Sequence, residues 1–268
     1  MSKHTFLSEA VLAGIGTHTG AECRVVVAPA EDGITFNGIQ LRIDNVAAES
    51  GFTSIGKLHT IEHLCSAMHA LGIDCARITT EAPEMPIFDG STAPIVELLQ
   101  AAGMRDLGVP QCALYIRRRV EYEDERGRVS LSPYERLELD VEIDYPEIAA
   151  IGRQYARVSL ADYPRIAAAR SFARMKDIEL WHSKGLALGA SLATGIGIGE
   201  DGRVMNPEGL RSPDEFVLHK VLDAIGDLYT CGMPVIGLYE SFKGGHRHNH
   251  ELMLRVMADE ENYEVKDL

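Results

Sequence analysis

The spacing of apolar and polar positions along the chain predicts a mixed α and β protein. Several stretches are rich in β-branched residues between turn residues, which is typical of strands; these are 22–30, 34–43, 76–81, 113–123 and 235–242. Residues 137–144 alternate strictly, with apolar side chains at the odd positions and mostly acids at the even ones. Such alternation predicts a half-buried antiparallel strand.

Other stretches are expected to be helical: 59–71, 94–102, 159–169, 176–184, 213–231 and a last helix from about His246. Thr60 is an expected N-cap of the first of these helices. The helix at 213–231 has the most complete start signal, because Ser212 would cap it, Pro213 would take the first position and Glu215 would complete a capping box. Gly232 is expected to end it.

The order of these elements predicts the organisation of the chain. Strands followed by helices occur twice, and the stretch 105–112 between the two runs contains Gly108 and Pro110. We therefore expect an α+β protein of two layers, with a first domain over residues 1–107 and a second over 108–268.

Composition and charge narrow the class of protein. The chain has 268 residues, of which 46% are hydrophobic and 25% charged, as in ordinary globular proteins. The formal net charge of −14 disfavours a nucleic acid as partner and disfavours adsorption to anionic lipids. An anionic substrate would therefore need a local cluster of basic side chains.

The same sequence indicates a cytoplasmic protein without integral membrane association. The five cysteines are odd in number and form no C-x-x-C pair, so we expect reduced thiols. The N-terminal residues do not resemble a signal peptide, and no apolar run reaches the ~18 residues of a membrane helix. No heptad seam argues for assembly, so a monomer is expected.

Three groups of residues have side chains and spacings that could bind a metal ion or transfer a proton. His219, Asp223 and Asp227 recur every four residues, which places them within an arc of about 80° on one helix face. The pair Glu62-His63 would allow the histidine to bind a metal while the glutamate handles a proton. The tract FKGGHRHNH at 242–250 holds three more histidines.

Each of these groups also has a structural interpretation. The polar face of the helix at 213–231 would simply face water, Glu62-His63 would be a surface pair, and the histidine tract would begin a helix. Asp89 in the turn PIFDGSTAP is expected to form an Asx turn rather than a site. GIGIGEDG at 195–202 is interpreted as a strand and hairpin, since no helix is evident after it.

Six motifs together resemble one family. They are GTHTG at 16–20, HTIEHL at 59–64, APEMPIFDGSTAP at 82–94, AARSF at 168–172, HKVLDAIGDLY at 219–229 and FKGGHRHNHEL at 242–252. Their order and spacing are similar to those of the UDP-3-O-acyl-N-acetylglucosamine deacetylases, zinc amidohydrolases of lipid A biosynthesis. The resemblance covers nearly the whole chain. It implies two β-α-α-β layers in a sandwich with the active site between them.

Carried over position by position, the resemblance implies that His63, His219 and Asp223 hold the metal. Glu62 would be the general base, and His246 would donate a proton to the leaving amine. Zn²⁺ with three protein ligands keeps a position open for water, and the same ligand set also suits Fe²⁺.

The resemblance also implies the supporting roles. Asp227 would orient His246, and Ser171 stands where the family has a threonine whose hydroxyl stabilises the oxyanion. The substrate, a small acylated nucleotide sugar, would contact five further residues: Lys220 and Lys243 at the diphosphate, His18 near it, and Tyr145 and Phe172 at sugar or base. An insert at about 171–200 would form the passage for the acyl chain.

Two departures from the family pattern leave other functions open. Ala190 replaces a glycine beside the acyl passage, and the stretch from Gly38 to Lys57 is shorter than the family's insert. A divergent metal-dependent deacetylase acting on another N-acyl amino sugar is the second hypothesis. A non-catalytic binding protein that keeps the fold is the third, although no implied ligand or base is missing.

Overall fold

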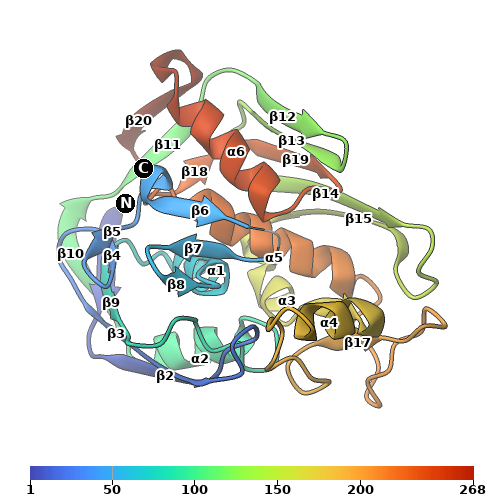
Figure 1. The fold of residues 1–268 in the computed structure, drawn as a ribbon. Helices are drawn as coiled ribbons and strands as arrows, with labels where there is room; N and C mark the ends of the chain where they lie inside the picture. Colours follow the sequence, from blue (N-terminus) through green and yellow to red (C-terminus); the bar gives the residue numbers. More distant parts are fainter. Residues whose placement is uncertain (50) are drawn as a thin grey trace.

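The computed structural model describes residues 1–49 and 51–268, and it is a mixed α and β structure (Figure 1). The strands of the first part of the chain are β1 (Ser2–Phe6), β2 (Ala10–Ile15), β3 (Glu22–Pro29), β4 (Ile34–Phe36), β5 (Ile39–Gln40), β6 (Val46–Ala48), β7 (Thr53–Ile55), β8 (Leu58–His59), β9 (Ala76–Thr79) and β10 (Met104–Pro110). The later strands are β11 (Cys112–Ile116), β12 (Val120–Asp124), β13 (Gly127–Ser132), β14 (Glu138–Tyr145), β15 (Gly152–Ser159), β16 (Phe172–Arg174), β17 (Ile196–Ile198), β18 (Val235–Ile236), β19 (Leu238–Phe242) and β20 (Tyr263–Asp267). The α-helices are α1 (Glu62–Leu71), α2 (Ala93–Ala101), α3 (Tyr163–Ala167), α4 (Met175–His182), α5 (Glu215–Tyr229) and α6 (His246–Met257).

Two five-stranded sheets share one topology. The first has the order β2-β3-β9-β4-β5 and the second β12-β13-β19-β14-β15. In both, the third and fourth strands pair in parallel while the other neighbours are antiparallel. The expected repetition of strand and helix order is therefore present as two sheets of equal plan.

Each sheet buries its alternate apolar side chains in a core of its own. One core combines Leu12, Val25 and Ile78 with α1 and α2, and the other combines Leu139 and Val141 with α5 and α6. Helices α1 and α5 pack against each other near the middle of the molecule (Figure 1). None of the helices in the described residues is long and apolar enough to cross a membrane.

A glycine allows α1 and α5 to meet. A Cβ atom added at Gly226 would lie 2.0 Å from the carbonyl oxygen of Glu62, so only glycine fits this crossing. Since Glu62 begins α1, the contact fixes the start of α1 against the last turn of α5. That contact sets the position of the site described below.

Several predicted strands differ in detail. Residues 34–43 were expected as one strand but form the hairpin β4–β5, because Asn37 and Gly38 both take positive φ, 49° and 81°, as a type I′ turn requires. The predicted strand 235–242 is divided at Gly237 into β18, which pairs with β11, and β19, which joins the second sheet. Strand β14 is antiparallel to β15 but parallel to β19.

The stretch 105–112, expected to break the pattern, largely belongs to strand β10, which pairs antiparallel with β1. Of the helix expected over 159–169, only α3 is α-helical, after a 3₁₀ turn at Leu160–Asp162. The insert at about 171–200 contains β16, α4 and β17, and β16 and β17 pair in parallel. The hairpin expected at 195–202 is present, since Ile198 bridges Val204.

The predicted starts of two helices are wrong. Ser212 does not cap α5 and Pro213 is not its first residue, because the helix begins at Glu215, directly after Asp214. Thr60 does not cap α1, because its φ is +63° and its hydroxyl donates to Glu84 at 3.2 Å instead. Glu215 completes no capping box, because its carboxylate faces Arg170 and accepts from the backbone N–H of Arg211. In both cases, a tertiary partner takes the side chain that the local pattern assigned to a cap.

Candidate active site

A cavity of about 490 Å³ collects residues from distant parts of the sequence. The start of α1, one face of α5 and the start of α6 meet there with the segment 171–197. All but one of the site residues predicted from the sequence line this cavity: His18, Glu62, His63, Tyr145, Ser171, Phe172, His219, Lys220, Asp223, Lys243 and His246. Asp227 lies behind His246 and contacts it.

His63, His219 and Asp223 converge on one point. Their ligand atoms all lie within 4.8 Å of one another, and in the described residues no other group of three or more His, Cys, Asp or Glu converges in this way. The Asp223 Oδ1 atom is 3.4 Å from His219 Nε2 and 3.8 Å from His63 Nε2. All three side chains are buried, so the face of α5 that carries His219 and Asp223 is not turned to water.

The chemistry of this donor set fits a divalent metal ion. Ligand atoms in a tetrahedral zinc site lie about 3.3 Å apart, given bonds of about 2.0–2.1 Å, which is close to the separations found here. His219 donates from Nδ1 to the carbonyl oxygen of Ala169 at 3.1 Å, which leaves its Nε2 lone pair facing the cluster. Burial lowers the pKa of His63 to about 3, helped by His219, so the imidazole is neutral and ready to bind.

Asp223 supplies the negative charge of the cluster. Burial alone would raise its pKa, but His219 and Lys220 beside it hold the pKa well below the ordinary value. The ammonium of Lys220 donates to Asp223 Oδ2 at 2.8 Å and lies over the ring of Phe172. The carboxylate is therefore ionised and held from two sides.

Glu62 lies next to the convergent ligands at the start of α1. Its side chain is 2% exposed, and its Oε2 atom accepts from the backbone N–H of Thr53 at 2.9 Å. Burial, together with the carboxylates of Asp227 and Asp223, raises the pKa of Glu62 to about 8, although His246 opposes the shift. A carboxyl with such a pKa can accept and return a proton near neutral pH.

His246 and Asp227 form a buried pair. The Nδ1 atom of His246 donates to Asp227 Oδ2 at 2.9 Å, and its Nε2 atom faces the cavity 3.9 Å from Asp223 Oδ2. Burial alone would lower the pKa of His246, but Asp227 and Asp223 raise it to about 10. The ring is therefore a proton donor at neutral pH.

Two residues around this pair were missed in the sequence. Thr53 donates its hydroxyl to Asp227 Oδ1 at 2.7 Å, and Asn249 donates to Asp227 Oδ2 at 2.8 Å. Asn249 lies three residues after His246 on α6, so helical spacing would have indicated it. Thr53 lies in β7, and no local signal in the sequence marks it.

The remaining predicted residues surround this centre. Ser171 lies two residues after Ala169, whose carbonyl oxygen accepts from His219. Phe172 packs edge-on against Tyr145 and Phe216. His18 packs against Phe52 with the two rings tilted and their centroids 4.9 Å apart, and both residues line the cavity. Their contacts with a substrate remain predictions.

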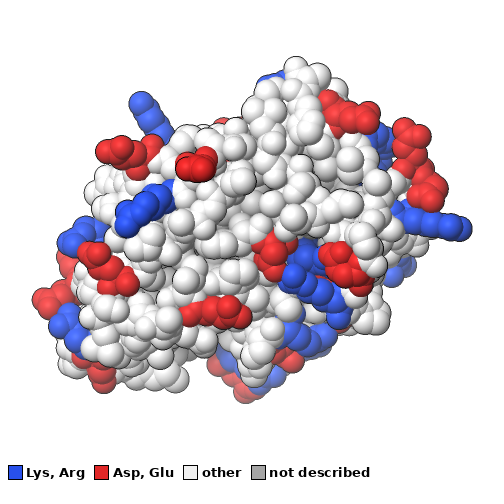
Figure 2. Space-filling model, turned by 90° about the horizontal axis from the view of Figure 1, so that it is seen from below, with Lys and Arg blue, Asp and Glu red and all other residues white. Residues whose placement is uncertain are grey.

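The lining of the cavity includes both basic and apolar side chains. Basic side chains at its lining are Arg126, Lys220, Lys243 and Arg247, and the apolar ones include Ile178, Trp181, Leu186 and Leu192 of the insert. Figure 2 shows the face over α2 and α4, where a wide area without charged side chains lies beside clusters of mixed charge. The local cations expected for an anionic ligand are thus present at the cavity despite the net charge of −14.

The other histidines of the tract at 242–250 have separate environments. His248 contacts Asp124 at 2.9 Å and the ring of Tyr122, so it anchors the β12–β13 turn. Asp89 forms the expected Asx turn with the backbone N–H of Ser91 at 3.0 Å and also accepts from Arg211. Of the three histidines in the tract, His246 is the one that reaches the convergent ligands.

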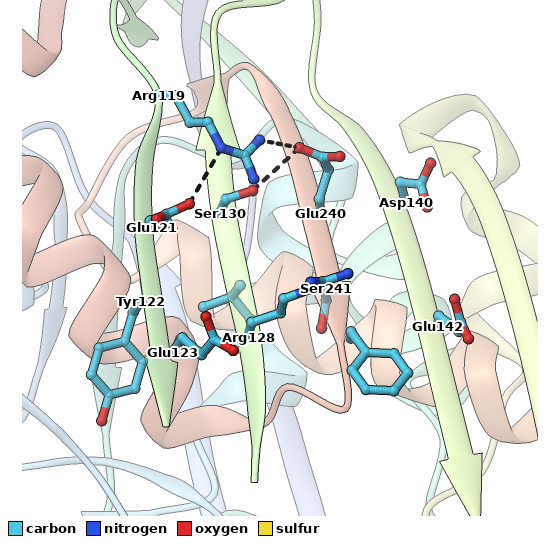
Figure 3. A pocket seen from close by; sticks show the side chains of 12 residues that line it. Arg119, Glu121, Tyr122, Glu123, Arg128, Ser130, Asp140, Glu142, Glu240 and Ser241 are labelled. Carbon is cyan, nitrogen blue, oxygen red and sulfur yellow. Dashed lines mark hydrogen bonds and ion pairs between the residues drawn. The ribbon is translucent and has the colours of Figure 1, made fainter. Parts of the chain in front are cut away.

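A second hollow lies on the outer face of the second sheet (Figure 3). There Arg119 bridges Glu121 and Glu240, and Ser130 donates to Glu240 at 3.2 Å. Arg128 lies over the ring of Phe242. These are exposed cross-strand pairs, and they lie outside the cavity that holds the convergent ligands.

Comparison with known proteins assigns the chain to a family. The model of the UDP-3-O-acyl N-acetylglycosamine deacetylase (LpxC) family matches residues 3–258. Similar proteins named UDP-3-O-acyl-N-acetylglucosamine deacetylase include one from Helicobacter hepaticus, 38% identical over 100% of this chain and 94% of its own length. Another, from Neisseria gonorrhoeae, is 38% identical over 98% of this chain and 92% of its length. The protein from Brucella ovis is 36% identical over 95% and 94%. The chain belongs to the UDP-3-O-acyl N-acetylglycosamine deacetylase family, as its six motifs predicted.

Proposed function

We propose that this deacetylase removes the acetyl group of UDP-3-O-(3-hydroxyacyl)-N-acetylglucosamine with one Zn²⁺ ion held by His63, His219 and Asp223. The observation that carries the proposal is the convergence of these three buried ligands beside Glu62 and His246. Zinc would acidify a water molecule and polarise the amide carbonyl. The same ligand set accepts Fe²⁺, so the metal in the cell depends on supply as well as on the site.

Glu62 and His246 would divide the two proton transfers. Glu62 would accept the proton of the attacking water in its carboxylate form, which the neighbouring His246 favours by opposing the rise of the Glu62 pKa. His246 is protonated at neutral pH and donates from Nε2 to the departing amine, which cannot leave as an anion. Asp227 keeps the donor ring in place through Nδ1 and stabilises its charge.

Ser171 would donate its hydroxyl to the oxygen that becomes negative during attack. One such donor contributes about 10²–10³ in rate in other hydrolases. A serine has more rotamers than the threonine usual in the family, so its hydroxyl depends more on its surroundings to be held.

The basic and the apolar side chains of the cavity suit different parts of the substrate. Lys220, Lys243 and His18 would face the diphosphate, and Phe172 and Tyr145 would pack on the sugar or base. The acyl chain would follow the apolar side chains of the insert. Ala190 also lines the cavity, so its methyl group would shorten the chain that fits.

The matching sheets support the finer architecture implied by the resemblance. We infer a sandwich of two β-α-α-β domains, residues 1–107 and 108–268, with the site between them; the shared strand order and the two cores support this division. We also infer that the protein is a monomer. We infer that it works in the cytoplasm, because its five cysteines are free, as is usual in a reducing compartment.

The test compares Glu62→Gln with wild type in an acetate-release assay on the acylated UDP-sugar at equal zinc content. We expect at least a 100-fold loss of kcat with zinc still bound, because the water loses its proton acceptor. Glu49→Gln, the same change at the cavity rim, is the matched control and should stay within twofold. Full activity of Glu62→Gln would contradict the proposal.

A second substrate series tests the alternative of a divergent deacetylase. If acetate is released faster from N-acetylated amino sugars without the acyl chain or the UDP group, that alternative is correct. Preference for the acylated UDP-sugar excludes it.

A further inference from the structure

A buried arginine directly precedes two residues of the candidate site and does not line the cavity itself. Arg170 is 2% exposed, whereas its neighbours Ser171 and Phe172 line the cavity. A guanidinium carries five N–H donors and stays charged, so its burial requires partners for that charge. These partners show what the side chain does.

The guanidinium of Arg170 is held on several sides by carboxylates and a carbonyl. Its Nε atom donates to Glu215 Oε1 at 2.8 Å, and Nη2 donates to Glu215 Oε2 at 3.2 Å. Nη1 donates to Glu208 Oε1 at 2.6 Å, and Nη2 also donates to the carbonyl of Gly209 at 2.8 Å. The backbone N–H of Arg170 contacts the same Glu215 Oε1 atom at 3.2 Å.

Glu215 connects this arginine to the helix of the metal ligands. It is fully buried in the first turn of α5, four residues before His219, so the two side chains lie on one side of the helix. The Arg170–Glu215 pair therefore fastens the segment 168–172 to the part of α5 that carries His219.

Two atoms of that segment have functions in the site. The carbonyl oxygen of Ala169 accepts from His219 Nδ1 at 3.1 Å, and Ser171 carries the candidate oxyanion donor. The backbone of Ser171 is held further by Gly90 and Ile196, at 2.8 and 2.7 Å. Arg170 lies between these two atoms in the chain, and its side chain provides the connection to α5.

We propose that Arg170 is a positioning residue that sets His219 and the Ser171 hydroxyl relative to each other through Glu215. The inference rests on the proposed function, because it gives the two positioned groups their roles. Lysine would not replace arginine here, since one ammonium cannot span both Glu215 oxygens, Glu208 and the Gly209 carbonyl in a planar fork.

The experiment uses Arg170→Lys in the full zinc-loaded chain and measures kcat, KM, the rate of zinc loss to a chelator and the thermal midpoint. We expect kcat to fall at least tenfold with KM within threefold. Zinc loss should be 10- to 100-fold faster, the usual effect of disturbing the hydrogen-bond partner of a ligating histidine. Arg165→Lys is the matched control, because Arg165 pairs at the surface with Asp214, the residue just before α5. This variant should leave kcat and the rate of zinc loss unchanged.

A folded Arg170→Lys variant with kcat and zinc loss within twofold of wild type would overturn the proposal. A lower thermal midpoint with both values unchanged would also overturn it, because the ion pair would then serve stability alone. If Arg170→Lys does not fold, Glu208→Ala decides, because it removes one exposed partner of Arg170. Faster zinc loss in Glu208→Ala supports positioning, and unchanged values overturn it. Failure of the proposed function is separate, since it appears as an inactive wild type or an active Glu62→Gln.

Discussion

Replacing Gly226 by alanine tests how the site is held together. Two effects oppose each other. Alanine favours a helix over glycine by about 1 kcal/mol, so in an open helix this change would stabilise the protein. Here the new methyl carbon would lie 2.0 Å from the carbonyl oxygen of Glu62 and 2.8 Å from its carbonyl carbon, both backbone atoms.

The geometry decides between these effects. Ordinary contact begins at 3.4 Å, so α1 and α5 would have to separate by about 1.4 Å at this point. Overpacking of this kind costs about 1–3 kcal/mol, which exceeds the gain in helix propensity. Because His63 follows Glu62, its distance to Asp223 would open from 3.8 Å to about 5 Å, too far for a shared metal ion.

We therefore expect Gly226→Ala to lose its metal and at least 100-fold in kcat/KM, while thermal stability falls only slightly. Zinc content by atomic absorption, acetate release and the thermal midpoint are the measurements. Gly14→Ala is the control, because its methyl would meet only a proline side-chain atom at 3.1 Å. A Gly226→Ala protein with normal zinc content and activity would refute the account of this helix crossing.

Three further predictions follow from single residues. Asp227→Asn should lower the pKa of His246 from about 10, so that the high-pH fall of kcat/KM moves to lower pH; an unmoved limb would contradict the role of His246 as acid. Ser171→Ala should reduce kcat by about 100-fold at unchanged metal content while Ser171→Thr keeps it, and equal rates for all three proteins would exclude an oxyanion role. Burial lowers the pKa of His69 from 6.5 to about 4, so between pH 6.5 and about 4 the folded state binds fewer protons than the unfolded state. The free energy of unfolding therefore decreases as the pH falls through this range, by about 3 kcal/mol in all. His69→Phe should remove this loss and move the acid-unfolding midpoint, followed by circular dichroism, to lower pH; an unmoved midpoint would show that His69 does not drive acid unfolding.

Local patterns in the sequence predicted most helices and the alternating strands because these elements bury one face each. The strict alternation at 137–144 corresponds to β14, in which Leu139, Val141 and Ile143 are buried. The pairing of β14 with β19 in parallel was not predictable, since strand partners are chosen by the packing of the whole sheet and not by the strand itself.

The candidate site, too, was predictable from the sequence only in part. Spacing on α5 brought out His219, Asp223 and Asp227, but spacing alone favoured a solvated helix face. The motif resemblance, and then burial in the structure, resolved that choice. Thr53 and Arg170 escaped notice because each acts through a partner more than 40 residues away, Asp227 and Glu215 respectively.

The capping errors have one physical cause. Thr60 and Glu215 occupy positions where a short polar side chain or a carboxylate would satisfy a helix terminus. Each instead contacts a buried charged residue, Glu84 or Arg170. A hydrogen bond to a buried charged group contributes more than a typical helix cap, so the tertiary contact prevails.

The most direct test of the account is a zinc titration of the metal-free protein with acetate release as the readout. We predict that activity rises linearly with bound zinc and saturates at one ion per chain. The same titration of Asp223→Ala should restore no activity. Saturation at another stoichiometry, or full activity of the metal-free protein, would contradict the assignment of His63, His219 and Asp223 as the ligands of a single catalytic ion.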